Sequence, residues 1–193
     1  MKHLFSGLFV VGICLALMAG CGPTATPVPT PQPTNTPAPT AIPTESPDRH
    51  YEPAGGFSYV PPAGWEMVKA PSLDYKVAVG PEADGFTTNL TVVDEPFDGS
   101  LDEYVSSAVD GLNQYFESFE VLSQNEFNVE AGLTGVRIVA ENVQSGSVLR
   151  QRFYLFDAGK TKFVVTCTRL AGAAAELDAA CDASVKTFRF EEE

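Results

Sequence analysis

Hydrophobic and polar residues follow three different patterns along the chain. Residues 4–17 form a largely apolar run, residues 22–47 show no apolar period, and residues 51–193 switch between two regular periods. Alternation of apolar and polar residues, which is typical of strands, recurs at 57–60, 75–79, 89–93, 127–131, 136–143, 148–157, 161–169 and 187–190. The pattern predicts one domain, residues 51–193, in which strands dominate.

Two segments of this domain have the three-to-four spacing of an amphipathic helix. The first begins at Ser100, where Ser100-Leu101-Asp102-Glu103 matches a capping box in which the first and fourth residues satisfy each other's backbone amides. Its apolar stripe consists of Leu101, Tyr104, Val105, Ala108, Leu112, Tyr115 and Phe116. The second helix is expected over residues 172–185, with Leu177, Cys181 and Val185 on one face. Since tight turns join the later strands, we expect an α+β fold with a central antiparallel sheet flanked by helices.

The hairpin of strands 136–143 and 148–157 carries the most distinctive polar cluster. A turn centred on Ser145-Gly146 places Glu141 opposite Arg150, Val139 opposite Arg152 and Arg137 opposite Tyr154. One face then carries Arg137, Arg150, Arg152, Glu141 and Tyr154, and the other carries Ile138, Ala140, Leu149 and Phe153. The three arginines and Tyr154 are a candidate binding site for a carboxylate, a phosphate or an acidic protein surface. The alternative is cross-strand salt bridging, with the arginine stems covering apolar surface.

Charge and composition exclude several functions. The chain has 25 acidic and 12 basic residues and a formal net charge of -13, which argues against nonspecific nucleic-acid binding. Its two histidines, His3 and His50, lie outside residues 51–193, so we expect no His-based zinc site or catalytic triad in the domain. We therefore predict no catalytic residue, no metal site, no cofactor and no enzymatic activity. Asp94, Glu95, Asp98, Asp102 and Glu103 gather at the start of the first helix, where they suit the helix dipole or, alternatively, calcium.

Two cysteines of the domain are expected to meet. Cys167 shares a strand face with Phe163 and Val165, and Cys181 lies on the apolar face of the second helix. In an exported protein such a pair forms a disulfide, and the alternative is two buried free thiols.

The first 20 residues are predicted to be a signal peptide. Lys2 precedes the apolar run, which is shorter than the ~20 residues of a membrane-spanning helix. Met18-Ala19-Gly20-Cys21 resembles the lipobox of bacterial lipoproteins, with Met in place of the usual Leu. The resemblance implies cleavage before Cys21 and its acylation, and hence a lipid anchor in the cell membrane or outer membrane, outside the cytoplasm. An ordinary secretory signal with an incidental cysteine is the alternative.

Residues 21–50 are predicted to hold the lipidated cysteine and a disordered linker. Nine prolines and seven threonines fall within residues 22–47, a composition that favours extended polyproline II. At about 3.1 Å per residue such a linker reaches roughly 80 Å. Membrane lipid, contacted through acylated Cys21, is therefore the first expected partner.

The domain itself resembles a known family. Gly56-Phe57-Ser58-Tyr59-Val60-Pro61 followed by Gly64-Trp65 resembles the opening of PsbP-like domains and their DcrB-like bacterial relatives, and the later order of elements is similar over residues 51–193. The resemblance implies an α/β sandwich without catalytic function. Its best-known members are extrinsic photosystem subunits that bind membrane complexes, and others are lipoproteins of poorly defined role.

Three functions follow from these observations. The first is a noncatalytic, lipid-anchored adaptor with a protein partner in a membrane or envelope complex. The second is a surface-tethered protein that binds a small ligand, which a deep apolar cavity between the sheet and a helix would favour. The third, implied by the resemblance alone, is a PsbP-type photosystem subunit. Two carboxylates facing each other in a cleft would instead point to a hydrolase.

Overall fold

A computed structural model describes residues 46–191 of the chain, and these residues form two sheets and two helices. The elements are β1 (His50–Glu52), β2 (Phe57–Tyr59), β3 (Glu66–Lys69), β4 (Lys76–Ala83), β5 (Phe86–Pro96), α1 (Leu101–Tyr115), β6 (Phe119–Asn128), β7 (Thr134–Gln144), β8 (Ser147–Ala158), β9 (Thr161–Leu170), α2 (Glu176–Lys186) and β10 (Arg189–Phe190). The predicted signal peptide, Cys21 and most of the predicted linker lie outside the described residues.

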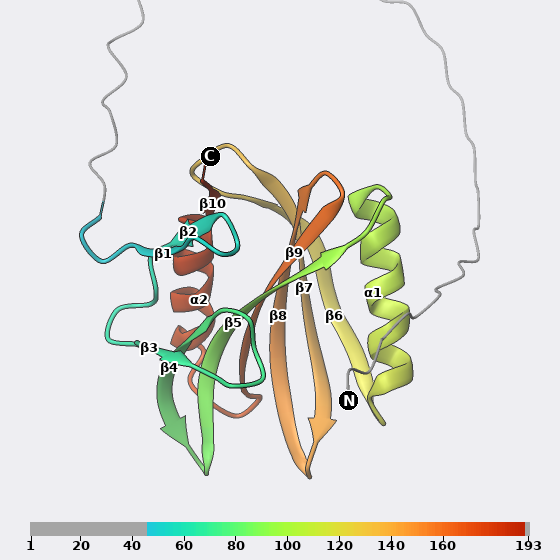
Figure 1. Cartoon of the computed structure of the whole chain (residues 1–193). Helices are drawn as coiled ribbons and strands as arrows, with labels where there is room; N and C mark the ends of the chain where they lie inside the picture. The colour runs from blue at the N-terminus through green and yellow to red at the C-terminus, as the bar shows by residue number, and fades with distance from the viewer. Residues whose placement is uncertain (1–45, 192–193) are drawn as a thin grey trace, which may run out of the picture.

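A seven-stranded antiparallel sheet is the centre of the domain (Figure 1). Its strand order is β3-β4-β5-β9-β8-β7-β6, so that β5 pairs with β9 although α1 and three strands separate them in the chain. A second sheet, β1-β2-β10, joins the start of the described chain to its end. The predicted α+β class with an antiparallel sheet is confirmed.

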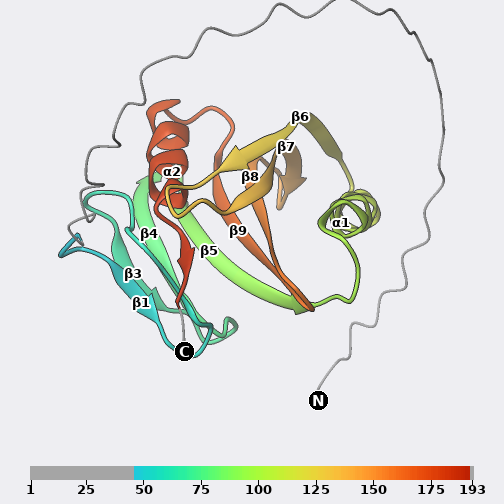
Figure 2. The same ribbon diagram turned by 90° about the horizontal axis from the view of Figure 1, so that it is seen from above.

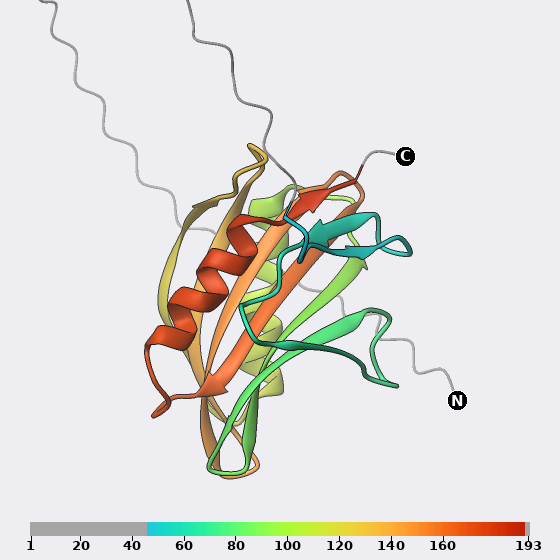
Figure 3. The same ribbon diagram turned by 90° about the vertical axis from the view of Figure 1, so that its left-hand side faces the viewer.

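The two helices cover opposite faces of the large sheet. Seen from above, the sheet curves around α1, and α2 lies against the other face (Figure 2). The view from the side shows α2 and the small sheet together in front of the large sheet (Figure 3). The molecule therefore has three layers, as the predicted sandwich requires.

Each face of the large sheet has its own apolar core. On the α2 face, aromatic side chains dominate, including Phe57, Tyr154, Phe156, Phe163 and Phe188. On the α1 face the fully buried members are Tyr104, Val105, Ile138, Ala140, Phe153 and Leu155. A disulfide joins Cys167 of β9 to Cys181 of α2 across the first core, which confirms that prediction.

The turns and the first helix form as expected. Ser145 and Gly146 have φ values of 51° and 81°, the conformation of a two-residue hairpin turn. The pairing is Glu141 with Arg150 and Arg137 with Tyr154, as predicted. At α1, Ser100 Oγ accepts from the Glu103 amide at 3.2 Å, and Glu103 Oε2 accepts from the Ser100 amide at 2.8 Å, which confirms the capping box.

Three boundaries differ from the predictions. β6 extends over ten residues, whereas the alternation predicted a strand only from 127, because this edge strand is exposed on both faces and needs few apolar residues. α2 begins at Glu176 rather than 172, because Arg169 Nη1 donates to the carbonyls of Leu170, Ala171 and Ala173 and holds that segment as a turn. His50 lies before the predicted start of the domain at residue 51, but it begins β1 and pairs with Tyr59.

Candidate functional site

The predicted arginine face lies beneath α2. Arg137 Nη1 is 2.9 Å from Asp182 Oδ2, and Arg152 Nη1 is 3.2 Å from Asp182 Oδ1. The hydroxyl of Tyr154, which is fully buried, donates to the same carboxylate at 2.5 Å. One aspartate of α2 therefore collects three of the four predicted binding residues.

A second aspartate extends this network. Asp178 Oδ2 is 3.1 Å from Arg152 Nη2, and the Asp178 carboxylate also pairs with Arg169, which is 2% exposed. Burial alone would raise the pKa of Asp178, but the hydrogen bonds and charges of Arg169 and Arg152 outweigh burial and lower this pKa. The result is a chain of alternating charges, Arg137–Asp182–Arg152–Asp178–Arg169, between the sheet and α2.

Arg150 lies outside this network. It pairs with Glu141 on the neighbouring strand at 2.5 Å, and both side chains are about one-third to one-quarter exposed, at 32% and 26%. The geometry thus matches the salt-bridging alternative. Most of the acidic partners of the arginines come from α2 and only Glu141 comes from the neighbouring strand. The binding role of Arg137, Arg150, Arg152 and Tyr154 stays a prediction.

The acidic residues near α1 do not converge. Asp94 and Glu95 are consecutive in β5 and point to opposite faces, so Asp94 accepts from Tyr75 at 2.7 Å while Glu95 accepts from Tyr104 at 2.8 Å. Asp98 pairs loosely with Lys160 at 3.8 Å, and Glu103 serves the capping box. Within residues 46–191, no group of three or more His, Cys, Asp or Glu side chains is placed to hold a metal ion.

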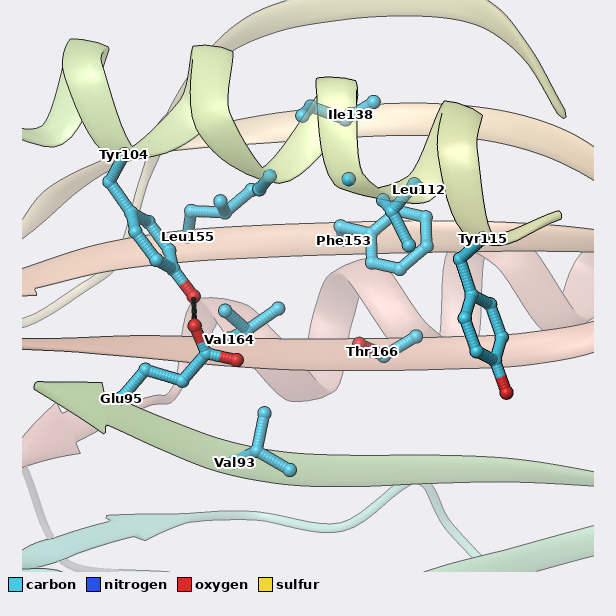
Figure 4. Close-up of a pocket in the computed structure, with 12 residues that line it drawn as sticks. Val93, Glu95, Tyr104, Leu112, Tyr115, Ile138, Phe153, Leu155, Val164 and Thr166 are labelled. Atoms are coloured by element: carbon cyan, nitrogen blue, oxygen red, sulfur yellow. Dashed lines mark hydrogen bonds between the residues drawn. The ribbon is translucent and has the colours of Figure 1, made fainter. Parts of the chain in front are cut away.

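The α1 face contains an apolar groove that the sequence did not reveal. It has a volume of about 360 Å³ and runs between α1 and the strands β5, β7, β8 and β9. Phe153, Leu155 and Val164 of the strands form its floor (Figure 4). On the helical side it is lined by Ala108, Gly111 and Leu112 of α1. Glycine inside a helix costs about 0.5–1 kcal/mol relative to alanine, and Gly111 leaves part of this side without a side chain.

Two tyrosines of α1 border the groove. Both side chains descend from the helix toward the strands, Tyr104 onto Glu95 and Tyr115 at the other end (Figure 4). Their separation of eleven positions corresponds to roughly 16 Å along the helix axis. Tyr115 is 78% exposed, whereas Tyr104 is 5% exposed. An exposed tyrosine thus borders one end of the groove and a buried tyrosine the other.

The Tyr104–Glu95 pair supplies the groove with its main polar groups. Burial raises the pKa of Tyr104, and the neighbouring Glu95 charge raises it further, so the hydroxyl stays protonated and donates. Thr166 adds a hydroxyl to the lining. Among the described residues, Glu95 is the one carboxylate of the lining, and no Lys, Arg or His contributes to it.

The sequence contained part of this information. Tyr104 belongs to the apolar stripe of the helix, and Glu95 belongs to the acidic cluster at its start. Alternation along β5 separates Asp94 from Glu95, and Gly111 interrupts a helix that otherwise favours side chains on its apolar face. These two signals could have indicated a groove, but the distance of α1 from the sheet depends on tertiary packing.

No helix among residues 46–191 combines the length and apolar character that crossing a membrane requires. The lipid anchor predicted at Cys21 falls in the segment before residue 46, on which the structure has no bearing.

No protein-family model matches the chain, and a search of curated proteins gave no match. Solved structures nevertheless share its fold. Cyanobacterial PsbP (CyanoP) from Synechocystis is 12% identical, with a TM-score of 0.55 over 81% of this chain and 98% of that one. LpqN of Mycobacterium tuberculosis, described as involved in cell envelope biogenesis, is 12% identical, with a TM-score of 0.55 over 70% of this chain and 83% of that one.

The Ran-binding protein Mog1p of Saccharomyces cerevisiae is similar as well, at 15% identity and a TM-score of 0.51 over 74% of this chain and 94% of that one. At such low identity these similarities show the fold alone. They support the PsbP-like architecture that the opening motif predicted.

Proposed function

We propose that this chain is a noncatalytic, lipid-anchored binding protein outside the cytoplasm, and that it holds a small, largely apolar molecule in the groove between α1 and the large sheet. The observation that carries the proposal is the groove itself. Its volume of about 360 Å³ falls within the range of ligand sites. Its lining is apolar except for a few polar groups at defined places, which is the usual composition of a small-molecule site.

The proposed anchor explains how an acidic protein stays at a membrane. A net charge of -13 opposes attraction of the chain to anionic lipids. An acylated Cys21 would hold it there, since each buried CH2 of an acyl chain contributes roughly 0.8 kcal/mol. The similarity to LpqN, described as involved in cell envelope biogenesis, supports an extracytoplasmic location.

The anchor is tested by labelling the full chain in growing bacteria with an alkyne-bearing fatty acid. We expect the label in the wild-type protein and its loss in Cys21→Ala. Equal labelling of the two proteins, or none in either, would contradict lipidation at this residue.

Binding is tested on the mature chain from residue 22, secreted with an ordinary cleavable signal so that no detergent competes for the groove. Both apolar cores and the disulfide lie within residues 46–191, so this form retains the described domain. The neutral fluorophore phenylnaphthylamine should brighten on addition of the protein. Gly111→Phe and Ala108→Phe fill the groove from the helical side and should abolish the signal.

Gln114→Phe is the matched control, because residue 114 is exposed and does not line the groove. It should leave the fluorescence unchanged. Circular dichroism identifies the variants that are folded. Undiminished fluorescence in both folded groove-filling variants would show that the groove does not bind the probe and would refute the proposal.

An adaptor function is the second candidate. β6 is an edge strand, and Val121 and Leu122 at its bulge are 38% and 43% exposed, which offers a small apolar surface to another protein. Crosslinking of the anchored protein in native membranes, compared with Leu122→Lys, tests this candidate. A crosslinked partner that disappears in the variant would favour the adaptor.

A further inference from the structure

We infer that the molecule held in the groove carries a positively charged head group, such as a primary ammonium, which docks on the carboxylate of Glu95. The inference rests on the proposed function, because it concerns the ligand of the same groove. It follows from three features of the described residues: the charge of the lining, the partners of the lysine opposite Glu95 and the hydrogen bond of Tyr104.

The lining of the groove is negative. Within residues 46–191, Glu95 is its one charged side chain at neutral pH, and it lies at one end of an otherwise apolar surface. The whole chain has a formal charge of -13, which raises the local concentration of cations and repels anions. A fatty carboxylate of the same size would therefore meet repulsion where an amine meets attraction.

The lysine opposite Glu95 on the neighbouring strand is engaged elsewhere. Lys162 of β9 is the cross-strand partner of Glu95, yet its ammonium is 3.0 Å from Asp157 and donates to the carbonyl of Phe97 at 3.2 Å. The Lys162 side chain is fully buried and also donates to the Gly159 carbonyl. In the part of the chain that the structure describes, no basic side chain forms an ion pair with Glu95.

Tyr104 orients the Glu95 carboxylate and leaves it free to accept further hydrogen bonds. Its hydroxyl donates to Glu95 Oε2 at 2.8 Å, which occupies one oxygen and orients the carboxylate at the Tyr104 end of the groove, where the Glu95 side chain is also exposed. The remaining lone pairs of Glu95 can only accept hydrogen bonds, and an ammonium supplies three donors.

The experiment compares three molecules that share a ten-carbon chain: decylamine, decanol and decanoate. Each competes with phenylnaphthylamine for the mature chain from residue 22, below its micellar concentration and at low salt. We expect decylamine to displace the fluorophore at a concentration about fivefold lower than decanol, since the charge pair is partly exposed. Decanoate should be the weakest competitor.

Two variants separate the charge of Glu95 from the charge of the chain. Glu95→Gln keeps the shape and the hydrogen bond with Tyr104 but removes the charge, and it should make decylamine and decanol equivalent. Asp110→Asn removes one charge from an exposed position of α1 outside the groove, and it should keep the preference for the amine.

The outcomes distinguish this inference from the proposed function. Equal displacement by decylamine and decanol, or a preference that persists in Glu95→Gln, would overturn the charged head group while the groove remains a binding site. Failure of all three competitors, together with undiminished probe fluorescence in folded Gly111→Phe, would overturn both.

Discussion

Arg169 of β9 and Asp178 of α2 form a bidentate ion pair. Arg169 Nε lies 2.7 Å from Asp178 Oδ1, and Arg169 Nη2 lies 2.7 Å from Asp178 Oδ2. The arginine is 2% exposed. Its Nη1 donates to three carbonyls of the segment that leads into α2. This one pair therefore fixes both the start of α2 and its position against the sheet.

Asp178→Asn should be among the most destabilising conservative substitutions in the domain. It leaves the buried charge of Arg169 without its counter-ion, and breaking a buried pair in this way costs about 3–5 kcal/mol. Urea unfolding followed by circular dichroism measures the loss. Glu141→Gln, which breaks the more exposed pair with Arg150, is the control and should cost less than about 1 kcal/mol. Equal effects of the two substitutions would contradict the assignment.

The same pair predicts a loss of stability in acid. Burial favours the neutral form of Asp178, but Arg169 and Arg152 outweigh it and lower the pKa below the ordinary 3.8. A carboxyl whose pKa is lower in the folded state stabilises the fold above its unfolded pKa and loses this contribution as the pH falls. The free energy of unfolding should therefore decrease as the pH is lowered from about 5 toward 2.

Asp178→Asn should flatten this acid slope, and urea titrations at several pH values measure it. Part of the slope should remain, because Glu191 also has a lowered pKa, through a hydrogen bond from Arg189 and a second from Ser58. Identical slopes in the variant and the wild type would show that Asp178 does not contribute.

The disulfide should stabilise the domain by about 3 kcal/mol on the chain-entropy account. Cys167 and Cys181 are 14 residues apart, and both are buried, so reductant should act mainly on unfolded molecules. Urea midpoints with and without reductant measure the effect. The Cys167→Ala/Cys181→Ala double variant should not respond to reductant; a response there would mean that reductant acts elsewhere.

Ser100→Ala should weaken the start of α1 by about 1 kcal/mol, because the Glu103 amide loses its acceptor. Ser100→Asp should restore the stability, since aspartate is an equally good N-cap. Thermal unfolding compares the three proteins. If Ser100→Ala and Ser100→Asp unfold at the same temperature, the hydrogen bond from the Glu103 amide makes no net contribution to stability.

The hairpin of β7 and β8 shows how much of the fold local sequence determines. Two residues with positive φ, Ser145 and Gly146, set the register of the whole hairpin. Because side chains alternate strictly in strands, the shared face of Arg137, Arg152 and Tyr154 follows at once. The partners of these residues do not follow, since they come from a helix some 30–45 positions further along.

A signal for those partners was nevertheless present. Arg152 is the cross-strand neighbour of Cys167, and the predicted disulfide places Cys181 against it. Asp182 follows Cys181 directly. If the two strands joined by the Asp157–Lys160 turn are paired, this aspartate comes to lie at the arginine face. The predicted salt bridges, by contrast, are confined to the hairpin itself, with Glu141 as the acid opposite Arg150.

The groove was less accessible to sequence reasoning. An apolar stripe on a helix predicts contact with a sheet, but the same stripe fits a helix that packs fully and one that leaves a gap. Tyr104 packs fully and Tyr115 does not, although both belong to the stripe. Tyr104 lies near the start of α1 and donates to Glu95, whereas Tyr115 is the last residue of the helix, and the stripe alone does not distinguish these two positions.

The small sheet β1-β2-β10 holds the start of the described chain. Arg49, directly before β1, donates from Nη1 to the Ser58 hydroxyl and to the Thr187 carbonyl, both at 2.9 Å, and His50 pairs with Tyr59. A pull on the preceding chain therefore meets these bonds first, on the α2 side of the large sheet. The groove lies on the opposite face, so in the lipid-anchored form that we propose, tension on the chain before Arg49 would strain the small sheet before it reached α1.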